Sequence, residues 1–147
     1  MSSGGRFQLL TSPGPAGIAV VRVRGDATQG FLVRHVRRSH GPQPETWLPG
    51  SVFRAALLDE SGGALDDALI SVHAAAPEWD IRLYLHGNPW LVGRCTELLR
   101  AAGLEQATDA PLDVWAAPDL LAAEAYALLP RMTTLRGARW LLAQVAR

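Results

Sequence analysis

Arginines are the residues of this chain whose charge could bind a ligand, and Arg22 is one of them, in the run GIAVVRVR. A guanidinium group in such a place either binds an acceptor group of a ligand or pairs with an acid of the same chain, for example Asp80. Further cations lie in the segment 34–40 (RHVRRSH) and could contact nucleic-acid phosphates. The end of a helix attracts the same cations, and no aromatic residues interleave with them, so we expect no direct nucleic-acid binding.

The other candidate side chains do not form a catalytic or metal-binding pattern. The acid pairs 59–60 and 66–67 lie in turn and strand segments, where adjacent side chains point to opposite faces, so we interpret them as surface charges. The four histidines lack metal-ligand spacing, and we expect His86 to cap or bond the turn that follows it. Cys95, the single cysteine, excludes an internal disulfide and a cysteine zinc site. We therefore predict no metal, no catalytic residue and no enzymatic activity.

Composition indicates the class of protein that presents these residues. The chain has 147 residues, 48% of them apolar, and a formal net charge of zero, as expected for one globular domain. It contains 14 arginines and no lysine, which excludes a phosphate-binding P-loop and Schiff-base chemistry. The N-terminus has no signal-peptide pattern and no apolar run is long enough to span a bilayer. We expect a cytoplasmic protein without membrane contact.

The first half of the chain predicts strands and one helix. Residues 7–11 and 17–24 are β-like runs separated by the breaker cluster SPGP. Residues 25–40 predict a helix with Asp26 or Thr28 as its N-cap and an apolar stripe that includes Val36. Two further β-like runs flank the turn at 59–63 and predict a hairpin.

The second half predicts one more strand and a helical end. Residues 80–87 alternate and predict a strand, after which Asn88 and Pro89 begin a helix that ends at Gly103. A turn-rich stretch leads to a helical region from residue 118 that Pro130 kinks or splits. The element order ββαβββαα predicts an α+β fold with a mostly antiparallel or mixed sheet and helices packed on one side.

Three segments resemble one protein family when taken together. The segment TSPGPAGIAVVRVRG resembles the opening pattern of the N-terminal domain of the tRNA-modification GTPase MnmE, also called TrmE. The segment from LDDALISVH through YLHGNPW to LLRAAG resembles the strand, turn and helix that follow in that family, and PDLLAAEAYALL resembles a later helix. The chain is thus similar to that domain over nearly its whole length, and residues 1–147 are expected to form one such domain. Residues from about 117 to 147 would correspond to the start of the family's helical region.

The resemblance implies a domain that dimerises and holds 5-formyl-tetrahydrofolate at or near the dimer interface, with a fold similar to the folate-binding part of aminomethyltransferases. The family's arginine contact falls on Arg22, which is retained. The family's acidic contact falls on Arg82 and its lysine on Ala117. An acid accepts hydrogen bonds from the donor edge of a pterin, whereas an arginine only donates, so these substitutions argue against the folate. The family's GTP-binding motif and C-terminal cysteine have no counterpart in this sequence.

Five tryptophans suggest what replaced the ligand. Trp79 and Trp90 flank the expected pterin pocket and Trp115 lies beside a shortened segment, so these aromatics would either fill the former pocket or build an apolar dimer surface. Our first hypothesis is a stand-alone, non-enzymatic, homodimeric interaction module with a degraded folate site, linked to tRNA wobble-uridine modification through partner proteins. The alternative is a folate-binding auxiliary protein that holds 5-formyl-tetrahydrofolate or a related one-carbon pterin.

Overall fold

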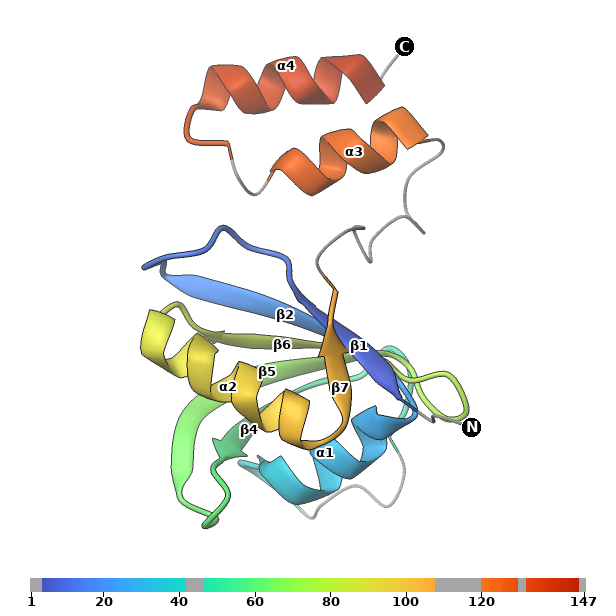
Figure 1. The fold of residues 1–147 in the computed structure, drawn as a ribbon, viewed down its shortest axis with the longest axis vertical. Coiled ribbons are helices and arrows are strands. Elements are labelled where there is room, and N and C mark those ends of the chain that lie inside the picture. The colour runs from blue at the N-terminus through green and yellow to red at the C-terminus, as the bar shows by residue number, and fades with distance from the viewer. Residues whose placement is uncertain (1–3, 42–46, 108–119, 130–131, 146–147) are drawn as a thin grey trace.

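The computed structural model describes residues 4–41, 47–107, 120–129 and 132–145, and its elements form a mixed sheet with helices (Figure 1). In chain order they are β1 (Gly5–Leu9), β2 (Ile18–Gly25), α1 (Ala27–His35), β3 (Val36–Arg38), β4 (Val52–Leu58), β5 (Ala64–Ala74), β6 (Asp80–His86), α2 (Pro89–Ala101), β7 (Leu104–Gln106), α3 (Leu120–Leu128) and α4 (Leu135–Val145). The predicted α+β class is confirmed.

The sheet has seven strands in the order β3-β4-β5-β6-β2-β1-β7. Every neighbouring pair is antiparallel except β1 with β7, which is parallel. The β4–β5 hairpin confirms the turn predicted at 59–63: Asp59 accepts from the backbone N–H groups of Ser61 and Gly63, and Gly62 adopts a φ of 85°. The sheet brings β2 and β6 together although about 60 residues separate them in the chain.

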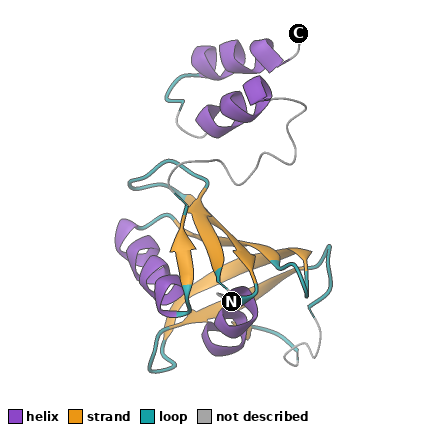
Figure 2. Cartoon of the chain, turned by 45° about the vertical axis from the view of Figure 1, so that its right-hand side comes forward, coloured by secondary structure: helices purple, strands orange, loops and turns teal. Residues whose placement is uncertain are grey.

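The main core lies between one face of the sheet and the helices α1 and α2, which both pack on that face (Figures 1 and 2). Alternate residues of each strand point into it, as the predicted alternation of Ile81, Leu83 and Leu85 requires, and all three are buried. Phe31 and Leu32 of α1 are fully buried against these strands. One face of every central strand therefore packs against the helices, and the alternate residues lie on the opposite face.

The predicted helix over 25–40 is too long. Helix α1 ends at His35, and Val36–Arg38 form the edge strand β3, which pairs with β4. Val36 is buried by this pairing, so its apolar side chain fits either interpretation, but the cations after it do not lie at a helix end. Asp26 occupies the N-cap position without a side-chain capping bond. Strand β7 was also missed, because the segment after Gly103 was interpreted as turn.

Helix α2 agrees with its predicted boundaries. The Asn88 side chain accepts from Trp90 N at 2.9 Å, Pro89 is the first helical residue, and Gly103 adopts a φ of 88° just beyond the end. This helix lies beside β6 and β7, so its position follows from the two strands that flank it.

The C-terminal helices α3 and α4 pack on each other and lie apart from the sheet (Figures 1 and 2). They are separate helices, as predicted for a region split near Pro130. Among the residues that the structure describes, no helix is long and apolar enough to cross a membrane.

Candidate functional site

The two arginines predicted at the ligand site face each other in the sheet. Arg22 of β2 and Arg82 of β6 are direct register partners. Both alternate with core residues, so they lie on the sheet face that α1 and α2 do not cover, which we call the distal face. Gln8 of β1 is the neighbour of Arg22 in the same row, and Ser71 of β5 is the neighbour of Arg82. The predicted third contact, Ala117, lies outside the described residues.

Arg22 forms a bidentate ion pair with Asp80. Its Nε donates to Asp80 Oδ1 at 2.9 Å and its Nη2 to Asp80 Oδ2 at 2.5 Å. Only 1% of the Arg22 side chain is exposed, against 13% for Asp80. The acid lies opposite Arg24 in register, and Arg24 Nε is 3.8 Å from Asp80 Oδ2. Two antiparallel strands place the acid diagonally beside Arg22, where it neutralises a buried cation that would otherwise be costly.

A hydroxyl and an imidazole meet in the same part of the distal face. Ser71 Oγ lies 2.9 Å from His73 Nε2, and its hydroxyl donates to Tyr84 Oη at 3.4 Å. No such pair was expected from the sequence, although residues two apart on a strand share a face. Ser71 is only 6% exposed, so a substrate carbonyl could not approach its Oγ from solvent without displacing neighbours. Ser71 therefore belongs to a row of polar side chains across the sheet, which we call the polar row: Gln8, Arg22, Arg82 and Ser71.

Exposed apolar side chains lie on the same face as this polar row. Ile18 of β2, Val52 of β4 and Leu69 of β5 are each about half exposed or more. Leu69 pairs with Tyr84, which in turn pairs with Val20, so an apolar row crosses β5, β6 and β2. The distal face thus combines a buried ion pair with solvent-exposed apolar groups.

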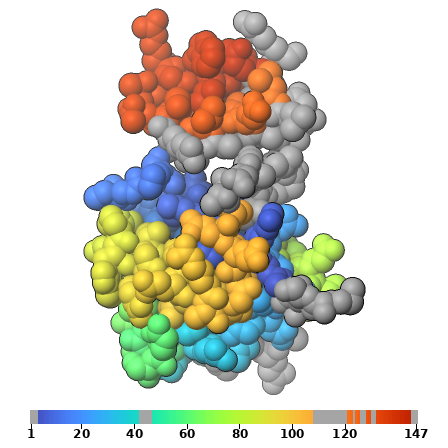
Figure 3. Space-filling model, in the orientation of Figure 1, coloured from blue at the N-terminus to red at the C-terminus, as the bar shows by residue number. Residues whose placement is uncertain are grey.

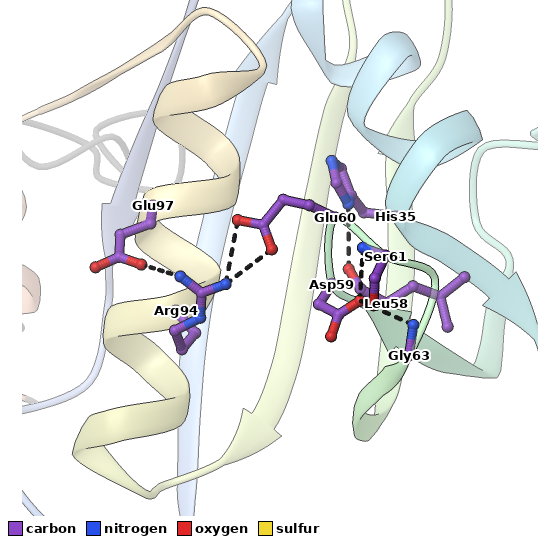
Figure 4. A network of polar contacts seen from close by, with 8 residues as sticks. All are labelled: His35, Leu58, Asp59, Glu60, Ser61, Gly63, Arg94 and Glu97. Atoms are coloured by element: carbon purple, nitrogen blue, oxygen red, sulfur yellow. Dashed lines mark hydrogen bonds and ion pairs between the residues drawn. The ribbon is translucent and has the colours of Figure 1, made fainter.

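The acid pair Asp59 and Glu60 forms structural contacts at the tip of the β4–β5 hairpin. Figure 4 shows Glu60 beside Arg94 of α2, whose Nη2 donates to Glu60 Oε2 at 2.8 Å, while Arg94 also donates to Glu97. A hydrogen bond from its own backbone N–H, and then the bonds from Arg94, lower the pKa of Glu60, while the bonds to Glu97 and Glu60 raise the pKa of Arg94. The hairpin is therefore attached to α2 by charge.

The second acid pair is divided between the two faces of β5. Asp66 accepts from His86 N at 3.0 Å and lies 2.6 Å from His86 Nδ1, which raises the pKa of His86. His86 therefore bonds across to β5, while Asn88 caps the helix. Asp67 pairs instead with Arg54. Among the described residues no three histidine, cysteine or acidic side chains gather as metal ligands.

The basic segment 34–40 is divided between two elements. Arg37 and Arg38 are exposed on β3, and the Arg38 guanidinium lies 5.5 Å from the centre of the Phe53 ring. Phe53 in turn contacts Trp47. No aromatic residue was expected among these cations, because Phe53 reaches them only through the pairing of β3 with β4.

The tryptophans near the expected pocket have different environments. Trp79 is buried in the main core, and its carbonyl accepts from Gly25 N at 3.0 Å. Trp90 is exposed at the start of α2, and Trp115 lies outside the described residues.

Comparison with known proteins agrees with the resemblance noted in the sequence. No family model matches the chain. A tRNA modification GTPase MnmE from Phenylobacterium zucineum is 33% identical over 105 residues, which are 69% of this chain and 22% of that protein. The MnmE of Koribacter versatilis is 28% identical over 103 residues, 67% of this chain and 22% of that protein. The chain is a distant relative of MnmE. It spans about a fifth of the length of the curated relatives it matches.

The residues at the two matched positions do not fit the folate that the resemblance to MnmE implies. The pterin presents an amino group and a ring N–H, which need an acceptor. Arg22 and Arg82 only donate, and both oxygens of Asp80 already accept from Arg22. The arginines at these two positions therefore do not supply the acceptor that this ligand requires.

Proposed function

We propose that the chain is a non-enzymatic interaction module that forms a homodimer through the distal face and serves tRNA modification through partner proteins. The link to tRNA modification rests on the name that its MnmE relatives carry. The folate site of the family is degraded in this proposal.

The observation that carries the proposal is the exposed apolar surface of the distal face. Ile18, Val52 and Leu69 lie on three strands of one sheet, and Leu69 is 49% exposed. Contiguous exposed apolar groups with an aromatic and arginines among them are typical of protein interfaces. Tyr84 and Arg82 supply these groups next to Leu69. A twofold axis through this face would cover the same patch on both copies.

Sedimentation equilibrium of matched variants tests the proposal. The substitution Leu69→Asp places a charge in the centre of the expected interface, and Val33→Asp places the same charge on an exposed apolar residue of α1. We expect Leu69→Asp to weaken the dimer at least tenfold, because an unpaired charge would be buried there, and Val33→Asp to leave it unchanged. The milder Leu69→Thr, which suits a strand, is expected to weaken it in the same direction.

Two outcomes would contradict the proposal. One is a wild-type chain that is monomeric at tens of micromolar. The other is a dimer that tolerates both substitutions at position 69 while circular dichroism shows that both variants are folded.

A further inference from the structure

A pocket of about 350 Å³ lies on the helix-covered side of the sheet, away from the distal face. The pocket lies between one side of α2 and the strands β1 and β2, and the loop 12–14 and Gln106 of β7 also line it. Helix α2, β7 and the N-terminal strands lie next to one another on the face shown in Figure 3. This volume is at the small end of the range for ligand sites, roughly 300 to 1,000 Å³.

The pocket exists because the residues between helix and strands are small. Helix α2 directs its large apolar residues, such as Leu98 and Leu99, into the main core, and turns Val92, Gly93 and Thr96 toward the pocket. A Cβ atom added to Gly93 would meet no atom within 4 Å apart from its chain neighbours and the backbone of its own helix. The side of the pocket formed by the sheet is apolar and includes Phe7 and Val21.

One end of the pocket is cationic. Arg100 lines it and donates from Nη2 to Gln106 Oε1 at 2.6 Å, which is a neutral amide. Within the part of the chain that the structure describes, Arg100 forms no ion pair with a carboxylate. Glu97 also lines this end, but it pairs with Arg94. Arg94, which also pairs with Glu60, thus holds Glu97, whereas Arg100 donates to a neutral amide and its charge is available to a ligand.

We propose that this pocket binds a small amphipathic carboxylate, with its apolar part over Phe7 and Val21 and its carboxylate on Arg100. A guanidinium binds a carboxylate through two parallel hydrogen bonds. A single cation with an acid close by matches a monoanion better than a doubly charged phosphate. The site lies on the opposite side of the sheet from the proposed dimer surface, so each proposal can be tested and rejected independently of the other.

Isothermal titration calorimetry with 2-naphthoate tests the site, and 2-naphthylmethanol provides an uncharged ligand of nearly the same shape. Gly93→Met fills the pocket, and Gly30→Met is its matched control, because Gly30 is an exposed glycine of α1 with equally open space around its Cβ position. Arg100→Gln removes the cation but can still donate a hydrogen bond, and Arg34→Gln is the control on α1.

We expect saturable binding of 2-naphthoate by the wild-type chain and by both controls. Gly93→Met is expected to weaken binding of both ligands at least tenfold. Arg100→Gln is expected to weaken 2-naphthoate at least tenfold and to change 2-naphthylmethanol less than twofold, because only the carboxylate forms a bidentate ion pair with the guanidinium. No saturable binding below 1 mM, or binding that Gly93→Met leaves unchanged, would overturn the site. Equal losses of both ligands in Arg100→Gln would overturn the assignment of the carboxylate.

Discussion

Removing the Asp80 carboxylate should expose how strongly the fold depends on neutralising Arg22. In Asp80→Asn the strands β2 and β6 keep their pairing, but the buried guanidinium of Arg22 loses its ion pair with the Asp80 carboxylate, to which it donates two hydrogen bonds. Breaking a buried ion pair by removing one partner costs about 3–5 kcal/mol, because the other charge stays buried. The asparagine oxygen can still accept one hydrogen bond from the guanidinium, which returns about 1 kcal/mol. We expect a net loss of about 2–4 kcal/mol in the free energy of unfolding.

The matched control is Asp67→Asn, which breaks the ion pair with Arg54 on the surface. Both of those side chains are more than 40% exposed, so the expected loss is below about 1 kcal/mol. Urea denaturation followed by tryptophan fluorescence measures both, and the Asp80 variant should unfold at a urea concentration lower by about 1 M or more. Replacing the cation as well, in Arg22→Met with Asp80→Leu, should recover much of the loss. The reasoning is refuted if Asp80→Asn loses no more stability than Asp67→Asn.

Three further outcomes follow from single residues. The hydrogen bond with Asp66 raises the pKa of His86, so the stabilisation that His86 contributes is complete below about pH 6.5 and is lost as the pH rises through the higher pKa of the folded chain. The stability difference between wild type and His86→Ala should therefore shrink from pH 5.5 to pH 8.5 in urea titrations. A difference that grows over this range would contradict this. Asn88→Ala removes the cap of α2 and should cost about 1 kcal/mol by thermal denaturation, with Asn88→Asp close to wild type. Burial raises the pKa of the Cys95 thiol to about 12, so a disulfide reagent at pH 8 should modify it only after unfolding, and rapid modification of the folded chain would show that α2 is not packed as described.

Local signals in the sequence predicted the central elements well. The turn at 59–63, the alternation over 80–87 and the Asn88-Pro89 start of α2 each depend on residues close in the chain, and each is confirmed. Strand β7 depends instead on a parallel partner about 100 residues away, β1, and three residues carry too little pattern to reveal it. The helix over 25–40 failed for the same reason, since pairing with β4 captures Val36–Arg38.

The candidate site was predictable only in part. The sequence raised the pairing of Arg22 with Asp80 as one alternative, and the structure shows it, since β2 and β6 are neighbours. The face-to-face position of Arg22 and Arg82 required the register of these strands. The pocket beside α2 could not be recognised in the sequence. It depends on the small side chains of Gly93 and Ala19, which lie on two elements that meet only in the folded chain.

The most direct test of this account is sedimentation velocity of the wild-type chain at tens of micromolar, with and without 1 mM 5-formyl-tetrahydrofolate. If the distal face is a dimer surface and the folate site is lost, the chain sediments as the same dimer in both solutions. A monomer that dimerises only with the folate would contradict the account.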